Sequence, residues 1–129
     1  MRYVYPAVFE HAKEGGFVVS VPDVEGCFSE GESLVEAMFM IQDALAMMLV
    51  YYEDHDNCIP EPTPIEKVNA PENCVVSLVL ADTDQWRRTY DNKAVKKTLS
   101  IPSWLNIKAT KAGVNFSQVL QDALIAKLM

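Results

Sequence analysis

The sequence predicts an α+β protein with two modules, a β-β-β-α-β amino-terminal module and a β-α-α carboxy-terminal module. Three observations predict this fold class. Residues 1–82 hold four strand-like stretches and one long apolar stretch of helical period. Residues 95–129 hold one further alternating stretch and two shorter helical ones. The charge divides at nearly the same place: residues 1–84 carry sixteen acidic and three basic side chains, a net charge of −13, whereas residues 85–129 carry two acidic and eight basic ones, a net charge of +6.

The first three strands are expected before residue 32. Apolar residues at alternate positions mark the first strand: Tyr3, Tyr5, Ala7 and Phe9. Pro6 cannot donate to a strand ladder, so this strand is predicted at an edge of the sheet or locally irregular. Gly15 and Gly16 then turn the chain into a second strand over residues 17–21, and a short third strand is expected at residues 27–29.

A helix is expected from Ser33 to about Tyr52. Ser33 followed by Glu36 forms a capping-box pattern, in which the hydroxyl and the carboxylate satisfy amides of the first turn. The apolar arc of this helix is wider than one sheet face needs, which leaves surface for a partner chain. Its most apolar part, residues 37–52, is shorter than the ~20 residues of a membrane span. No signal peptide precedes the first strand, so a cytoplasmic protein with no membrane partner is expected.

The remaining segments set the expected domain boundaries. Residues 53–73 are polar and contain four prolines, which predicts a loop. Residues 74–80 are rich in β-branched side chains and predict a strand in the centre of the sheet. The first domain is therefore placed at residues 1–82, a linker with room for a short helix at 83–94, and the second domain at 95–129.

The second domain is predicted from a strand and two helices. In residues 95–102 the apolar side chains point one way and Lys96, Thr98 and Ser100 the other. Pro102 ends this strand at the start of a helix, which Gly113 ends. Asn115 with Gln118 then forms a capping-box pattern for the last helix.

This small domain is expected to work only as a homodimer. Fewer than about 40 residues do not build a core alone, and a single strand leaves its backbone unpaired. The same strand of a second copy is the simplest partner. The resulting two-stranded ribbon fits the major groove of DNA. The pattern resembles the ribbon-helix-helix repressors. The resemblance implies base-edge contacts from Lys96, Thr98 and Ser100 and backbone contacts from Asn115 and Ser117, with Lys93 and Lys97 in the same DNA-binding set.

The first domain resembles the HicB antitoxins of toxin–antitoxin pairs. The resemblance rests on the aromatic first strand, on Gly16-Phe17-Val18-Val19, on residues 21–27, on Glu30-Gly31-Glu32-Ser33 and on Glu36-Ala37. It implies a partial RNase H-like fold that binds a HicA toxin, a small basic mRNA-cleaving ribonuclease. It also implies repression of the operon by the ribbon-helix-helix domain at operator DNA, as a dimer that further contacts extend to a tetramer.

The acidic charge supports the same partner independently, because a surface of net charge −13 covers a basic RNA-binding surface. The predicted toxin-binding residues are the acids of the turns and of the helix end: Asp23, Glu25, Glu30, Glu32, Glu53, Asp54 and Asp56.

Catalysis, a metal and a cofactor are not expected. The second and fourth strands contain no carboxylate, whereas two-metal hydrolysis needs several that converge. Cys27, Cys58 and Cys74 form no metal-ligand spacing with the two histidines and are expected as small core residues. The alternative is a stand-alone ribbon-helix-helix repressor whose acidic domain binds another ligand.

Overall fold

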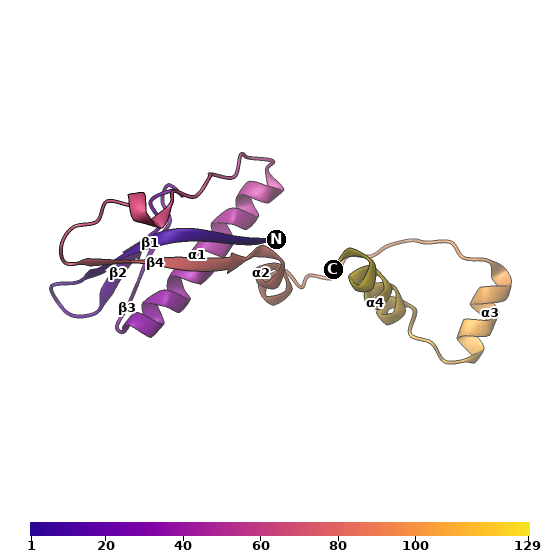
Figure 1. Ribbon diagram of the computed structural model, residues 1–129. Helices are drawn as coiled ribbons and strands as arrows, with labels where there is room; N and C mark the ends of the chain where they lie inside the picture. The colour runs from indigo at the N-terminus through magenta and orange to yellow at the C-terminus, as the bar shows by residue number, and fades with distance from the viewer. The chain divides into compact units, whose positions relative to one another are not determined.

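A computed structural model describes all residues, 1–129, and divides the chain into two compact units, residues 1–93 and 94–129 (Figure 1). The first unit contains a four-stranded sheet and two α-helices, and the second contains two α-helices. Each unit is described by itself.

The strands of the first unit are β1 (Arg2–His11), β2 (Phe17–Ser20), β3 (Phe28–Gly31) and β4 (Cys74–Asp82). They pair antiparallel in the order β3-β2-β1-β4. β1 is paired with β4 over its length, from Arg2 opposite Asp82 to Glu10 opposite Cys74. The predicted order of three strands, one helix and one strand is therefore the observed order of this sheet and its covering helix.

The predicted central position of β4 is wrong, because β4 lies at the edge of the sheet. β1 lies between β2 and β4, so the prediction of an edge strand does not hold for β1 as a whole. β2 pairs only with Val8–His11, so Pro6 lies on a part of β1 that has β4 as its only neighbouring strand. A proline is tolerated there because no second strand needs its missing N–H.

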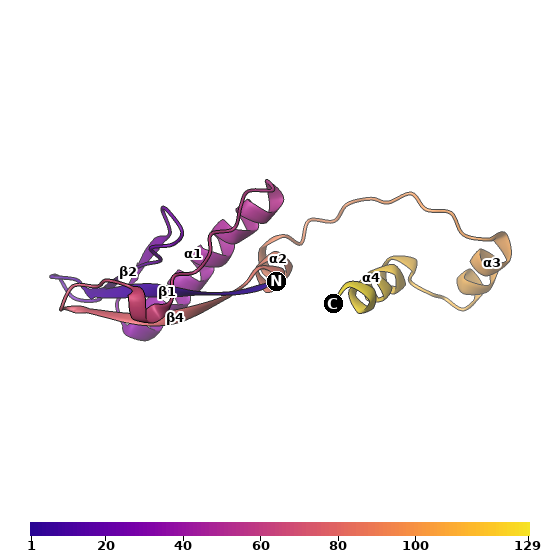
Figure 2. The ribbon, with the colours of Figure 1, turned by 45° about the horizontal axis from the view of Figure 1, so that its top comes forward.

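The helix α1 (Leu34–Asp54) covers one face of the sheet (Figure 2). Ser33 caps it as predicted, since its Oγ accepts a hydrogen bond from the Glu36 N–H at 3.1 Å. The Glu36 carboxylate accepts from the N–H of Glu32 rather than from that of Ser33. Five buried side chains of α1 pack on the inward residues of β1, β2 and β4, and they are Ala37, Ile41, Leu45, Ala46 and Leu49. Val50 is also buried.

α1 ends at Asp54, beyond the predicted end at about Tyr52. Its full length therefore has to be compared with that of a membrane span. Its 21 residues, with a mean hydropathy of 1.6 over a window of 18 residues, are enough, by length and composition, for a membrane span. The core helix of a soluble protein has the same properties, and α1 has six buried side chains, five of which belong to the core that it shares with the sheet. Its length therefore does not identify it as a membrane helix.

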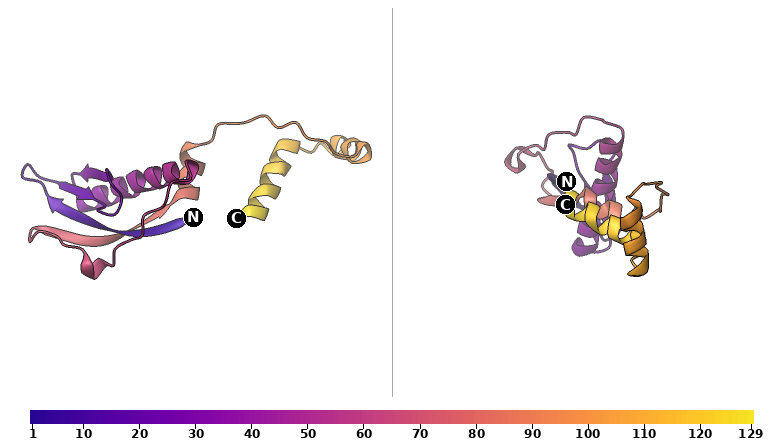
Figure 3. Two further views of the ribbon diagram at one scale, coloured as in Figure 1. Left: turned by 90° about the horizontal axis from the view of Figure 1, so that it is seen from above. Right: turned by 90° about the vertical axis from the view of Figure 1, so that its right-hand side faces the viewer.

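A long loop joins α1 to β4 and contains the short 3-10 helix η1 (Ile65–Lys67). α1 and η1 lie on opposite sides of the strands (Figure 3). Asp23 holds this loop, because its carboxylate accepts from the N–H of Thr63 at 2.9 Å and from its Oγ1 at 2.6 Å. Pro6 is fully buried, whereas other residues on its face of the sheet remain exposed.

Residues 83–90 of the expected linker form the helix α2 (Thr83–Tyr90). Asp82 caps it, with its carboxylate accepting from the Gln85 N–H at 3.1 Å. Trp86 packs against the core of the first unit, and Arg87 pairs with the end of α1. α2 therefore belongs to the first unit.

The second unit contains α3 (Ser103–Lys111) and α4 (Phe116–Leu128). Gly113 ends α3 as predicted, at φ +70°, and hydrogen bonds from Gly113 to Thr110 and from Val114 to Ala109 close the helix. Asn115 caps α4 through the Gln118 N–H, but the Gln118 side chain donates to Asp122 instead of completing a capping box.

The strand predicted at residues 95–102 is not formed in the single chain. A strand is stabilised by hydrogen bonds to a neighbouring strand, and no other strand pairs with this segment. The side chains of residues 94–102 are all exposed.

Candidate functional site

The predicted toxin-binding acids divide between the two ends of α1. Glu30 lies on β3 and Glu32 just before the first turn, both exposed. Asp54 and Asp56 lie at the other end. The loop of Asp23 and Glu25 runs beside that second end, because a Cβ at Gly26 would lie 3.9 Å from Met48 Cε.

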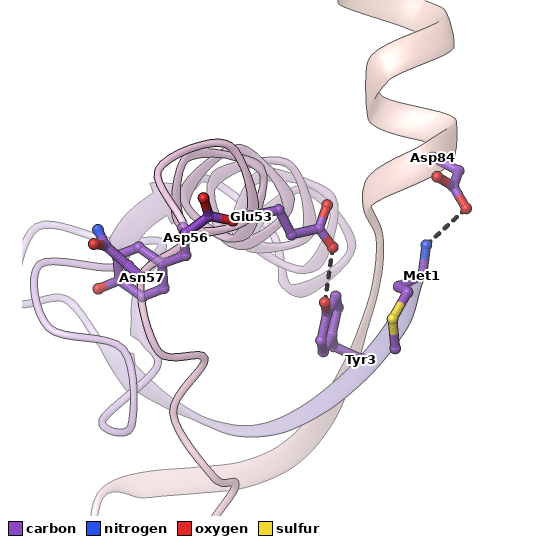
Figure 4. Close-up of a pocket in the computed structure, with 7 residues that line it drawn as sticks. Met1, Tyr3, Glu53, Asp56, Asn57 and Asp84 are labelled. Atoms are coloured by element: carbon purple, nitrogen blue, oxygen red, sulfur yellow. Dashed lines mark hydrogen bonds and ion pairs between the residues drawn. The ribbon is translucent and has the colours of Figure 1, made fainter.

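Glu53 does not lie free on this surface. Tyr3 Oη donates to Glu53 Oε2 at 2.7 Å (Figure 4). Thr83 Oγ1 lies 3.1 Å from the same oxygen. Arg87 Nη2 donates to Glu53 Oε1 at 3.1 Å and to Asp54 Oδ1 at 2.9 Å. One carboxylate therefore joins β1, α1 and α2, three elements that are distant in the sequence.

The electrostatics of this cluster follow from its partial burial. Burial, followed by the hydrogen bond to Glu53, raises the pKa of Tyr3 to about 12. Hydrogen bonding to Asp54, and secondarily to Glu53, raises the pKa of the Arg87 guanidinium. Both effects keep the tyrosine neutral and the arginine charged at neutral pH. Glu53 is thus a structural residue whose role the sequence did not show.

A shallow depression of about 560 Å³ opens beside this cluster, and Figure 4 shows its residues. Three carboxylates line it, those of Glu53, Asp56 and Asp84, and the Met1 amine donates to Asp84 at 2.7 Å. Asp56 has a positive φ of 52° and an exposed side chain. The arrangement suits contact with a basic side chain of another molecule.

Asp23 is also occupied within the fold through its bonds to Thr63. Glu25, Glu30, Glu32, Asp54 and Asp56 remain exposed. Of the seven predicted acids, three have a partner within the fold, namely Asp23, Glu53 and the half-exposed Asp54, and the other four are exposed.

Apolar side chains are exposed between the two acidic ends of α1. Met40, Met47 and Tyr51 are spaced by about two turns and one turn of helix and are 46%, 51% and 55% exposed. We call these three residues the methionine stripe. Met38 and Met48, in contrast, pack against the core. The predicted surplus of apolar surface on this helix is confirmed.

The DNA-binding residues predicted in the second unit are all exposed. Lys93 is the last residue of the first unit, and Lys96, Lys97, Thr98 and Ser100 lie in the unpaired segment before α3. Asn115 and Ser117 lie at the beginning of α4, but the Asn115 side chain already accepts from Gln118. The chain alone therefore does not bring these residues into one surface.

The second unit has no buried side chain. Its apolar residues are instead strongly exposed, including Val95 at 80%, Trp104 at 63% and Ile125 at 55%. A compact unit with this much apolar surface is incomplete by itself and needs a partner that covers it.

The cysteines do not form a site. Cys27 is buried, and burial raises the pKa of its thiol to about 11, so it is not a thiolate at neutral pH. Cys74 is half-buried and Cys58 is exposed. The prediction that all three are core residues holds for Cys27 and is wrong for Cys58, which lies in the loop after α1.

Sequence reasoning left room for a short helix where α2 lies but missed that this helix belongs to the first unit and contacts α1. Asp82 followed by Gln85 is a helix-start pattern that could have predicted it. The partners of Glu53 have no comparable local signal, because Tyr3 and Arg87 are 50 and 34 residues away from it.

Comparisons with known proteins agree with this architecture. Residues 5–127 match the family model of the HicB-like antitoxin of bacterial toxin–antitoxin systems. An uncharacterised 14.9 kDa protein in the rep-hol intergenic region of Haemophilus phage HP1 is 35% identical over 79% of this chain and 75% of its own. Antitoxin HicB of Escherichia coli K12 is 36% identical over 47% of this chain and 44% of its own length. A toxin–antitoxin complex from Streptococcus pneumoniae contains a chain similar over 98% of this chain and 99% of its own, with 26% identity and a TM-score of 0.65.

Proposed function

Because the chain belongs to the HicB-like antitoxin family, we propose that it is the antitoxin of a type II toxin–antitoxin pair. Its first unit binds and neutralises a HicA-type mRNA-cleaving ribonuclease. Its second unit forms a ribbon-helix-helix dimer that represses the operon. The cytoplasm is the compartment in which both activities are needed.

The observation that carries the toxin-binding role is the charge of the first unit. Residues 1–84 have a net charge of −13, and among the predicted acids only Asp23, Glu53 and Asp54 have a partner within the fold. A ribonuclease has to attract RNA phosphates with basic side chains. An acidic surface attracts the same side chains and repels RNA, so it competes for the toxin's substrate-binding surface.

The methionine stripe provides the apolar part of the same interface. It lies between the acidic groups at the two ends of α1, with Glu32 before the helix and Asp54 in its last turn. Protein interfaces combine an apolar centre with a polar rim, and methionine adapts to irregular partner surfaces. In a toxin bound along α1, contact with the helix covers the substrate-binding surface, and the acidic side chains at the two ends of the helix hold the toxin in place.

The exposed apolar side chains of the second unit support dimerisation. In a second copy, residues 95–102 would find the strand partner that the single chain lacks, and the apolar side chains of α3 and α4 would become buried. The ribbon then presents Lys96, Thr98 and Ser100 to base edges. The first-turn amides of α4 near Ser117 are placed to bind a phosphate.

Co-purification tests the toxin-binding role. The chain is expressed with the small basic protein of the neighbouring reading frame, and only one of the two is tagged. A stable complex that blocks RNA cleavage by the partner is expected. If no complex forms while the dimer still binds promoter DNA, the protein is a stand-alone repressor with another ligand for its acidic unit.

Two charge-removing variants test the acidic surface. Glu25→Gln and Asp56→Asn remove exposed charges with little change of shape, and Asn also tolerates the positive φ of Asp56. Each should weaken toxin binding about two- to fivefold, the effect of a surface charge pair of roughly 0.5–1 kcal/mol. Glu14→Gln, on the turn before β2, is the matched control and should leave the affinity unchanged.

A further inference from the structure

The first half of β1 has a free edge on the side away from β4. β2 pairs only with Val8–His11, so the residues of β1 before Val8 have no strand on that side. The register explains why the pairing ends there. Val8 lies opposite Ser20, and two residues further along the ladder Pro6 would lie opposite Pro22. Neither proline has an N–H to donate, so the sequence itself leaves this edge open.

Two hydrogen bonds just beyond the strands show which backbone groups of β1 point to this edge. The Thr83 N–H donates to the Met1 carbonyl at 3.0 Å, so the odd-numbered residues of β1 are those that bond to β4. The Ala12 N–H donates to the Gly16 carbonyl at 3.0 Å, so the even-numbered residues are those that point to the side of β2. The two assignments agree.

Arg2 and Val4 therefore direct their N–H and C=O groups to the open edge. None of these four groups has a hydrogen-bond partner in the chain. The edge is also accessible, since Val4 is 45% exposed. A row of unpaired N–H and C=O groups on a strand is a template for an extended segment of another molecule.

A groove of about 500 Å³ opens beside these groups. Residues 1–5 form one side of it, and residues 59–62 of the loop after α1 form the other. The loop is held in place, because Ile59 packs against the core and the Pro60 carbonyl accepts a hydrogen bond from Tyr5 Oη. The loop makes no backbone hydrogen bond to this part of β1. The groove is therefore preformed, while its strand side still lacks hydrogen-bond partners.

The charges around the groove favour a basic occupant. Glu61 lies in its wall. At its other end the groove joins the acidic depression beside the end of α1, because the two share Met1 and Tyr3 (Figure 4). The guanidinium of Arg2, the one basic side chain in the lining, already pairs with Asp82 at 3.4 Å. A segment with lysine or arginine side chains would find carboxylates at both ends of the groove.

From these features we infer that an extended basic segment of the toxin binds in this groove and adds a strand to the open edge of β1. Its backbone pairs with the N–H and C=O groups of Arg2 and Val4, and its basic side chains reach the acidic depression. The toxin as occupant rests on the proposed function. The groove extends the interface proposed along α1, since the depression contains Glu53 and Asp56 from the end of that helix.

Amide hydrogen exchange of the full chain, measured by NMR with and without the small basic protein of the neighbouring reading frame, tests the pairing. The Val4 amide should exchange rapidly in the chain alone and at least about tenfold more slowly in the complex. The amides of Tyr5 and Ala7 face β4 and are the control, protected in both states.

The outcomes separate the pairing from the proposed function. If the complex forms and the exchange of the Val4 amide is unchanged, the pairing is overturned and the proposed function stands. If no complex forms, the proposed function fails and the pairing with it. A Val4 amide that is already protected in the chain alone would show that another part of the same protein occupies the groove, and would overturn the toxin as occupant.

A proline variant tests the same hydrogen bond by affinity. Val4→Pro removes an outward N–H at a position equivalent to Pro6, where β1 accepts a proline. It should weaken toxin binding about three- to tenfold, the effect of one lost backbone hydrogen bond. Val4→Ala keeps the N–H and should leave the affinity within about twofold of wild type.

Leu78→Pro is the matched proline control. Leu78 lies opposite Pro6 on β4, so this variant removes an outward N–H from the other edge of the sheet. Its side chain is 51% exposed, close to the 45% of Val4. Its affinity for the toxin should stay within about twofold of wild type. Thermal unfolding followed by circular dichroism shows that each variant is folded. Equal affinities of the two folded proline variants would overturn the pairing at β1.

Discussion

Replacing Glu53 by alanine tests the idea that this acid is structural. The change removes the acceptor of the Tyr3 hydroxyl, which has no other partner, and one of the two carboxylates that bind Arg87. Thr83 Oγ1 keeps the Met1 carbonyl as an acceptor at 3.2 Å. The expected loss therefore comes mainly from the tyrosine and only partly from the arginine.

The magnitude follows from these contacts. A hydrogen bond to a charged group contributes about 1.5–3 kcal/mol. Loss of one partner from a partly exposed ion pair whose arginine keeps a second carboxylate costs about 0.5 kcal/mol. Glu53→Ala should lower the free energy of unfolding by about 2–3.5 kcal/mol. For a unit of this size the melting temperature should fall by about 10 °C or more.

Thermal and urea unfolding followed by circular dichroism measures this loss. Asp54→Ala is the matched control, because Asp54 is adjacent and binds the same arginine but is half exposed. It should cost about 0–1 kcal/mol. A double-mutant cycle of Glu53→Gln with Tyr3→Phe should give a coupling of about 1 kcal/mol or more between the two side chains. If the two alanine variants were equally stable and the cycle showed no coupling, the structural role of Glu53 would be refuted.

Three further predictions follow from other parts of the chain. Gly31→Ala should destabilise the first unit by about 2–4 kcal/mol in urea unfolding, since its Cβ would lie 2.4 Å from the Ala37 backbone nitrogen. Gly15→Ala is the control: no atom lies within 4 Å of its Cβ, so only its positive φ should count, at about 1 kcal/mol. The pKa of Tyr3 rises from 10.0 to about 12 on folding, so between pH 10 and 12 the folded state binds more protons than the unfolded state. The free energy of unfolding should therefore fall as the pH rises through this range, and this tyrosine should have no such effect below pH 10. Tyr3→Phe should remove that part of the pH dependence. On DNA, Thr98→Ala or Ser100→Ala should weaken specific binding by ~1–3 kcal/mol, whereas Lys93→Ala or Lys111→Ala should weaken binding to all sequences and reduce the salt slope; equal losses on specific and random DNA for both kinds of variant would show that the strand face is assigned wrongly.

The sequence by itself was enough to predict features that depend on neighbouring residues. Ser33 and Asn115 begin helices, and Gly113 ends one, because caps use side chains and φ values within a few positions. The alternation in β1 identified its buried face, and the division of charge separated an acidic segment from a basic one. The sequence also predicted that apolar side chains of α1 remain exposed, because its apolar positions span a wider arc of the helix than one sheet face covers.

Only the tertiary structure decided which distant segments meet. Sheet order depends on pairing across the chain, so the edge position of β4 and the place of β1 between β2 and β4 had no local signal. The same reason explains why Glu53, predicted as a surface acid, is held by Tyr3 and Arg87 inside the fold. For residues 95–102 even one chain's tertiary structure is insufficient, because a strand requires a partner strand that this chain does not provide.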